Sequence, residues 1–189
     1  LIILYSAVIY GDFTGGIDIT IGLSRMCGLK LAENFDRPFS SRSTAEYWNR
    51  WHITMGSYFT DYVFYPLSIC RPMQALTKWC RGHLGRVVGM RVPVYLATLF
   101  TWFLTGLWHG ASWNFILWGL YFALFLVLEK YVFKWQKHGG KITVHFRRLY
   151  TLAVVWFGWF LFRFDDMSQL GHALKSLFFF GNGINGDNA

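Results

Sequence analysis

The stretch from Val92 to Leu128, "VPVYLATLFTWFLTGLWHGASWNFILWGLYFALFLVL", runs for 37 residues without Asp, Glu, Lys or Arg. A single helix of that length would measure about 55 Å, whereas the hydrocarbon core of a bilayer is ~30 Å thick. The stretch is therefore predicted to form a helical hairpin, residues 92–128, that turns at "WHGAS". Its only histidine, His109, lies at the tip of this hairpin.

The composition places the chain in a membrane. Hydrophobic residues make up 54% and charged residues 15%, against roughly 25% charged in soluble domains. Residues 1–10 resemble the end of another apolar segment, and residues 149–164 are predicted to form a further membrane helix. We predict an all-α, multi-pass protein of the plasma membrane. Because the chain begins inside an apolar run, residues 1–189 are expected to be an internal fragment of one domain that lacks N-terminal and C-terminal helices.

Two basic clusters bracket the hairpin. Residues 71–91 contain five Lys or Arg and no acidic residue, and residues 129–148 contain six basic residues and one acidic residue. Loops on the cytoplasmic side of membrane proteins carry such an excess of positive charge. Both stretches are therefore predicted to be cytoplasmic basic loops, with the hairpin tip directed toward the outside. The same distribution argues against nucleic-acid binding, because cytoplasmic loops of a membrane protein already account for the positive charge.

Residues 1–70 are expected to hold a polar surface loop and interfacial helices. A helix is predicted from Ser43, which can cap it; Glu46 lies three residues on, and Glu46 with Arg50 makes an i,i+4 pair. From residue 51 to 69 the chain is aromatic but interrupted by Asp61 and Pro66, which is typical of an interfacial or re-entrant segment. Basic residues on both sides predict that the aromatic block from Trp51 to Tyr65 lies shallowly at the cytoplasmic face rather than spanning the membrane.

Two histidines are candidates for chemistry. Ionisable side chains inside a membrane are rare and tend to mark pathways or catalysis, so His109 is a candidate functional residue. The alternative is a histidine satisfied by a hydrogen bond to a neighbouring carbonyl. Gly106 and Gly110 are expected to leave room for a substrate beside it. His52 is the second candidate, with the alternative of an ordinary interface histidine. No metal-ligand spacing occurs, so a metal site is not expected.

Several motifs resemble one family. "AENFDRPFSSRSTAEYWNRWHITMGSYFTDYVFYPL", residues 32–67, is similar to the central signature of bacterial membrane-bound O-acyltransferases, the MBOAT family, and "GLWHGASWNFILWGL", residues 106–120, is similar to its histidine motif. The resemblance implies an MBOAT-type helical bundle in which His109 and His52 are the signature histidines. It also implies that His109 lies in a tunnel where a cytoplasmic acyl thioester meets an acceptor hydroxyl from the outer side.

The function expected from this resemblance is O-acyl transfer. An acyl group, acetyl by preference, would pass from a thioester donor, either acetyl-coenzyme A or an acyl carrier protein, to a hydroxyl of an extracytoplasmic cell-envelope polysaccharide. His109 would be the general base and His52 would support it. No bound cofactor is expected; the partners would be membrane lipid, donor, acceptor and a transfer protein outside the membrane. The alternatives are a transporter or channel subunit with a pore-lining His109, and a non-catalytic scaffold.

Overall fold

The computed structural model describes residues 2–133, 141–164 and 166–178, and all the regular elements in these ranges are helices. This confirms the all-α class. In chain order the elements are α1 (Ile2–Met26), η1 (Pro38–Ser40), α2 (Thr44–Trp48), α3 (Ile53–Phe59), η2 (Thr60–Phe64), α4 (Tyr65–Ile69), α5 (Arg71–His83), α6 (Gly85–His109), α7 (Trp113–Leu128), η3 (Glu129–Phe133), α8 (Lys141–Arg163) and α9 (Met167–Phe178). The η2 and η3 segments are single stretches of π-helix.

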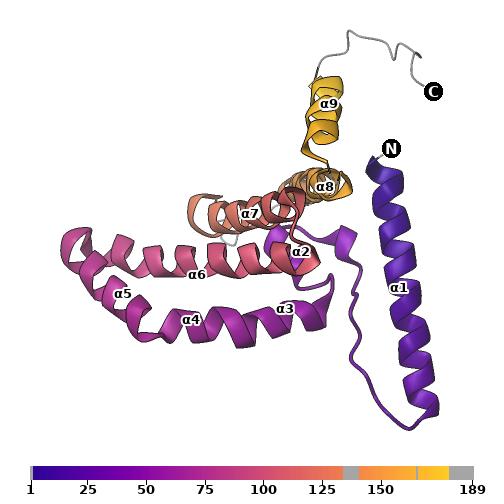
Figure 1. Ribbon diagram of the computed structural model, residues 1–189, viewed down its shortest axis with the longest axis horizontal. Helices are drawn as coiled ribbons and strands as arrows, with labels where there is room; N and C mark the ends of the chain where they lie inside the picture. Colours follow the sequence, from indigo (N-terminus) through magenta and orange to yellow (C-terminus); the bar gives the residue numbers. More distant parts are fainter. Residues whose placement is uncertain (1, 134–140, 165, 179–189) are drawn as a thin grey trace.

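The predicted hairpin is present as α6 and α7, which lie side by side and turn between Gly110 and Ser112 (Figure 1). Glycines set how closely the two helices pack. A Cβ atom at Gly119 would clash with the carbonyl oxygen of Trp102, and one at Gly106 would clash with the carbonyl oxygen of Phe115. Three helical stretches are long and apolar enough to cross a membrane: Ile2–Met26, Gly85–His109 and Trp113–Phe133. The chain is thus an all-α membrane protein.

The expected basic loop at residues 71–91 is wrong, because this stretch is helical. It forms α5 and the first two turns of α6. Met73 and Cys80, seven residues apart, are buried on one face of α5 against α6, while Arg71 and Lys78 lie exposed on the other face. Charge alone does not break a helix when its apolar residues keep a helical period.

The other expected boundaries also shift. Within the predicted basic loop at residues 129–148, the start is π-helix η3 and the end belongs to α8, while residues 134–140 lie outside the described residues. The predicted membrane helix at residues 149–164 falls in α8, which begins at Lys141; α8 is not among the three candidate spans. In the N-terminal region, a single helix α1 continues through the glycine-rich residues up to Met26.

Residues 44–69 form a re-entrant segment between the end of α7 and the tip of the hairpin. Its start lies beside Glu129, whose carboxylate accepts hydrogen bonds from Thr44. Trp48 then packs on Trp102, with ring centroids 4.8 Å apart. At His52 the chain turns, and α3, η2 and α4 return alongside α6 toward its charged end (Figure 1). The segment therefore enters and leaves at the same end of the hairpin.

This path corrects one expectation. The two flanks of the aromatic block do lie at one end of the hairpin, but the block between them is not shallow. Its first residues reach the hairpin tip, where the His52 ring lies 6.2 Å from the ring of Trp108. Contacts between aromatic rings hold these residues at the tip, including the stacked rings of Tyr47 and Trp51, whose centroids lie 5.8 Å apart.

The beginning of α2 is held by hydrogen bonds to the Ser43 hydroxyl and to a buried carboxylate. The predicted cap is confirmed: Ser43 Oγ accepts from the backbone N–H of Glu46 at 3.0 Å, and Glu46 pairs with Arg50 at 2.9 Å. A carboxylate from a distant part of the sequence also binds the start of α2. Glu129, only 7% exposed, accepts from the Thr44 N–H at 2.8 Å and from the Thr44 hydroxyl at 2.6 Å. Negative charge at a helix N-terminus is stabilising.

Replacing Glu129 by Gln should therefore destabilise the whole protein. Hydrogen bonds to a charged acceptor contribute ~1.5–3 kcal/mol, and an amide oxygen cannot replace both carboxylate oxygens at Thr44. We expect a fall of several degrees in the melting temperature of the purified protein in detergent. Glu33→Gln is the matched control, because Glu33 makes an ion pair with its side chain 65% exposed. Equal melting temperatures for the two variants would contradict the anchoring role of Glu129.

Candidate active site

His109 is the last residue of α6 and lies in a cage of aromatic rings. The rings of Trp108, Trp118 and Phe162 have centroids 4.8, 5.0 and 5.1 Å from the imidazole centroid. These rings come from α6, α7 and α8, so the cage exists only when the three helices pack together. Among the described residues, the half-buried imidazole has no hydrogen-bond partner. The reading of a histidine satisfied by a nearby carbonyl is therefore not supported.

The two glycines beside His109 do not leave the room expected for a substrate. Gly106 packs against the backbone of Phe115, and Gly110 packs against its ring. Their lack of a side chain lets the start of α7 approach the end of α6. This close approach places Trp118 and Phe115 around the imidazole. The glycines thus shape the cage rather than an opening.

His52 sits at the turn between α2 and α3 in a left-handed conformation, with φ 50° and ψ 51°. This region is uncommon for residues other than glycine and is often found at functional sites. Asn34 holds the turn in place. Its Oδ1 accepts from the Thr54 hydroxyl at 2.7 Å and from the Thr54 N–H at 3.1 Å, and it lies 3.4 Å from His52 Nδ1.

Asn34 Oδ1 accepts hydrogen bonds from Thr54, so toward His52 it is also an acceptor. This determines which ring nitrogen of His52 carries the hydrogen. Nδ1 carries the hydrogen and Nε2 is left as the free acceptor. Burial lowers the pKa of His52 below its ordinary value of 6.5, which keeps the ring neutral at neutral pH. Sequence reasoning missed Asn34, since a lone Asn in a polar loop gives no signal of the fold that surrounds it.

The two candidate histidines, separated by 56 residues in the sequence, flank one aromatic ring. Trp108 lies 6.2 Å from His52 and 4.8 Å from His109, measured between ring centroids. Phe59 from α3 approaches the same Trp108 ring at 6.5 Å. The structure therefore brings together the two residues that the sequence singled out.

Two adjoining cavities lead from the charged end of the hairpin toward this pair. The outer cavity measures about 580 Å³ and the inner one about 440 Å³. Both cavities are lined by Ala45, Thr60, Thr101, Trp102 and Leu126, so they lie directly beside each other. The inner cavity extends to Ile53 and Thr105, the residue after His52 and the residue one helical turn before His109.

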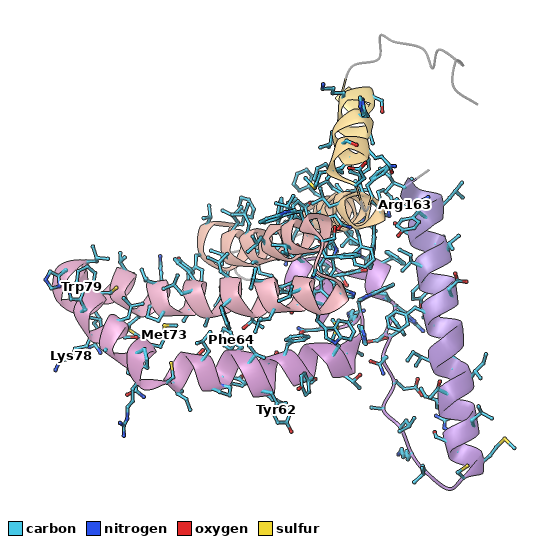
Figure 2. The ribbon with its side chains drawn as sticks, in the orientation of Figure 1. Tyr62, Phe64, Met73, Lys78, Trp79 and Arg163 are labelled. Atoms are coloured by element: carbon cyan, nitrogen blue, oxygen red, sulfur yellow. The ribbon has the colours of Figure 1, made fainter. Side chains whose placement is uncertain are left out.

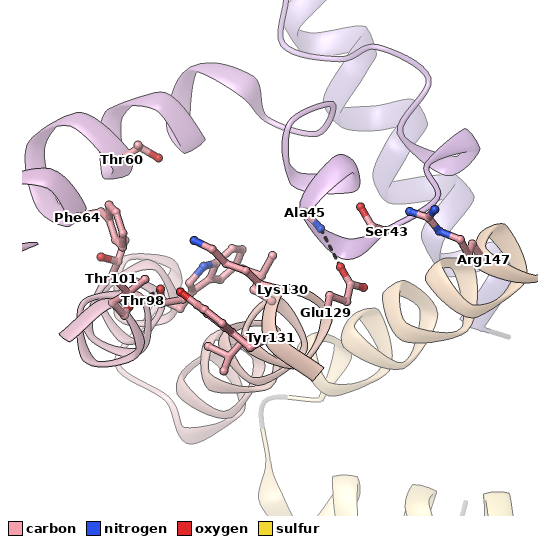
Figure 3. Close-up of a pocket in the computed structure, with 14 residues that line it drawn as sticks. Ser43, Ala45, Thr60, Phe64, Thr98, Thr101, Glu129, Lys130, Tyr131 and Arg147 are labelled. Carbon is pink, nitrogen blue, oxygen red and sulfur yellow. Dashed lines mark hydrogen bonds between the residues drawn. The ribbon is translucent and has the colours of Figure 1, made fainter. Parts of the chain in front are cut away.

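The outer cavity has a cationic mouth. Lys130 and Arg147 line it, and Figure 3 shows Lys130 pointing into the space between the helices that carry Thr60 and Ala45. The neighbouring carboxylate of Glu129 is turned toward the backbone of α2, where it is bound. Anionic groups are therefore favoured at this entrance.

Asn114 is a further polar group in the wall near His109. It is completely buried at the start of α7, and its Nδ2 donates to the Phe162 carbonyl at 3.4 Å. Its Oδ1 has no hydrogen-bond partner among the described residues. A buried acceptor without a partner costs free energy, so this oxygen is available for a ligand or a water molecule. In the same described part of the chain, no group of His, Cys, Asp and Glu gathers as a metal site would.

The fold and the site define a class: an all-α membrane protein with two histidines close to residues that line the inner end of a cavity, next to a second cavity with a cationic mouth. No protein-family profile matches the chain. Individual curated proteins do match the chain. The chain is 31% identical to a probable alginate O-acetylase of Azotobacter vinelandii over 179 residues, 94% of this chain and 32% of the relative.

Two further relatives carry different names. A teichoic acid D-alanyltransferase of Bacillus subtilis is 29% identical over 163 residues, 84% of this chain and 39% of the relative. A peptidoglycan O-acetyltransferase of Helicobacter pylori is 27% identical over 183 residues, 96% of this chain and 31% of the relative. The chain thus spans about a third of the length of these curated relatives. It is a member of the MBOAT-like family.

The lowered pKa of His52 predicts a pH dependence of stability. At pH values above 6.5 the ring is neutral in both the folded and the unfolded chain. Below pH 6.5 the unfolded chain binds a proton that the folded chain resists, so stability should fall as the pH falls toward the folded pKa. His52→Asn removes the titrating group and tolerates the left-handed backbone. The melting temperature of the whole protein should drop less between pH 6.5 and 5 in this variant; identical slopes would contradict a buried, neutral His52.

Proposed function

We propose that the whole protein is a plasma-membrane O-acyltransferase. It moves an acyl group, acetyl by preference, from a cytoplasmic thioester donor to a hydroxyl of an extracytoplasmic polysaccharide. The observation that carries the proposal is the imidazole of His109, caged by aromatic rings and without a hydrogen-bond partner among the described residues, near the inner end of a cavity with a cationic mouth. The names of the relatives, which are acetyl and D-alanyl transferases, support the reaction class.

His109 acts as the general base. Its free ring nitrogen takes the proton of the acceptor hydroxyl, whose oxygen attacks the carbonyl carbon of the thioester. The carbon–sulfur bond then breaks, an ester forms, and the thiolate receives the proton from the imidazolium. The aromatic cage supports this role, because the buried ring of Trp118 and the ring of Phe162 limit the access of water, which would otherwise hydrolyse the thioester.

His52, whose ring also lies near Trp108, supports the reaction. With its Nδ1–H directed to Asn34 Oδ1, its Nε2 can accept one hydrogen bond from the donor or the acceptor. The left-handed backbone at this position fixes the direction of the ring. His52 therefore positions a substrate, while His109 moves the proton.

The donor enters through the outer cavity. Coenzyme A and the prosthetic arm of an acyl carrier protein both carry phosphate, and Lys130 and Arg147 at the mouth suit phosphate. From Val94, which lines the outer cavity, to His109 the helix rises about 22 Å over 15 residues. A long, flexible thioester arm is needed to cover that distance. This supports a donor of this class rather than a small activated acid.

The proposed acceptor follows from the names of the relatives. Their names specify alginate, teichoic acid and peptidoglycan, all extracytoplasmic polymers that carry hydroxyl groups. A polysaccharide hydroxyl is accordingly the proposed acceptor, reached from the outer side directly or through a transfer protein. A transporter or channel built on the same His109 would give flux across vesicles without an acylated product, so an acyl-transfer assay separates the two functions.

Replacing His109 by Gln should abolish most acyl transfer. General base catalysis contributes ~10²–10⁴-fold, so the rate measured with radiolabelled donor in membranes should fall by that factor. The protein should still fold, because Gln fills the same cage. His172→Gln is the matched control, as His172 is exposed on α9. A near-normal rate in His109→Gln would contradict the role of His109 as the base.

A further inference from the structure

The outer face of α5 is a cationic surface with no acidic counterpart. Arg71, Lys78 and Arg81 are exposed, and none of the three has an ion-pair partner among the described residues. The sequence contains no Asp or Glu between residues 62 and 128. Because α5 turns Met73 and Cys80 toward α6, Arg71 and Lys78, seven residues apart, lie together on the opposite side of the helix, whereas Arg81 packs against Gly89 of α6.

The position of α5 along α6 places this surface at the edge of the membrane. The uncharged stretch of α6 starts directly after Arg91, so the hydrocarbon layer begins at about that residue. α5 packs along the same charged end of α6. Figure 2 shows Lys78 and Trp79 at the outer end of this helix pair. Trp79 is 56% exposed, and exposed tryptophans are enriched at the level of lipid headgroups.

An apolar groove of about 400 Å³ opens next to this surface, on the hydrocarbon side. Its walls come from α4, α5, α6 and α7 and consist of Leu67, Met73, Leu96, Leu99, Phe100, Phe103 and Leu120. The α6 residues of the groove lie within the uncharged stretch, so the groove faces the acyl-chain layer. From Leu96 to Phe103 it extends about 10 Å along the helix. Met73 of α5 lines the groove, so the helix that carries Arg71 and Lys78 also borders the groove.

We propose that α5 and the adjoining face of α6 bind an anionic phospholipid. Its phosphate headgroup contacts Arg71 and Lys78, and one acyl chain occupies the apolar groove. A lipid of the bilayer fits both features, since its charge meets the cations while its chain lies at the depth of the groove. An acidic protein would match the cations alone. The proposal does not depend on acyl transfer.

The test measures lipid binding by the whole protein. It is purified in detergent and exposed to equal amounts of phosphatidylglycerol and phosphatidylcholine with the same acyl chains, and the retained lipids are counted by native mass spectrometry. The wild type should retain phosphatidylglycerol preferentially. Arg71→Gln with Lys78→Gln should reduce this preference about 30-fold, since each basic residue near a membrane surface contributes a factor of roughly five.

Three matched variants complete the test. Lys30→Gln with Lys175→Gln removes the same charge from exposed positions elsewhere and should keep the preference. Arg71→Lys with Lys78→Arg keeps the charge and should also keep it. Leu99→Trp fills the groove and should reduce retention of both lipids.

Three results would overturn the proposal. The first is a wild type that retains the two lipids equally. The second is a loss of preference in the control double variant as large as in the test variant. The third is an unchanged lipid preference in the test variant; loss of binding to an acidic carrier protein in the same variant would then assign the surface to a protein partner.

Discussion

The site depends on the buried carboxylate of Glu129. A helix of only five residues, such as α2, cannot satisfy its own backbone N–H groups, because the first four have no partner within the helix. Glu129 accepts hydrogen bonds from the N–H groups of Thr44 and Ala45 and thereby ties the start of α2 to the end of α7. With its start fixed at that end of the hairpin, the chain reaches the hairpin tip at His52, four residues after the short helix ends, and both His52 and His109 lie near Trp108 there.

Local patterns in the sequence were sufficient to predict part of this arrangement. The hairpin followed from the length of an uncharged stretch compared with the thickness of a bilayer. The cap at Ser43 and the ion pair between Glu46 and Arg50 followed from spacing within one helix. His109 could be selected because an ionisable group in apolar surroundings needs a reason, and His52 because it follows a helix rich in charged and aromatic residues. Each of these predictions uses one continuous stretch of sequence and no contact between distant segments.

The remaining features depend on contacts between distant segments. Glu129 and Thr44 are 85 residues apart, and in the sequence Glu129 was only the single acid within a basic stretch. Asn34 gave no signal, because its partners gather around it only in the folded chain. The depth of the re-entrant segment was misjudged for the same reason: the basic flanks define where the chain enters and leaves but not how far it penetrates. For α5, the cationic residues concealed the helical period of Met73 and Cys80.

The most direct test of this account measures how close the re-entrant segment comes to the hairpin tip. The rings of Phe59 and Trp108 have centroids 6.5 Å apart. In the whole protein, with Cys27, Cys70 and Cys80 replaced by Ser, Phe59→Cys and Trp108→Cys should be joined by a short bifunctional thiol reagent in native membranes. Efficient cross-linking is the predicted result. Failure of this pair to react, while each single cysteine is still labelled, would show that the segment does not reach the hairpin tip and would contradict the account.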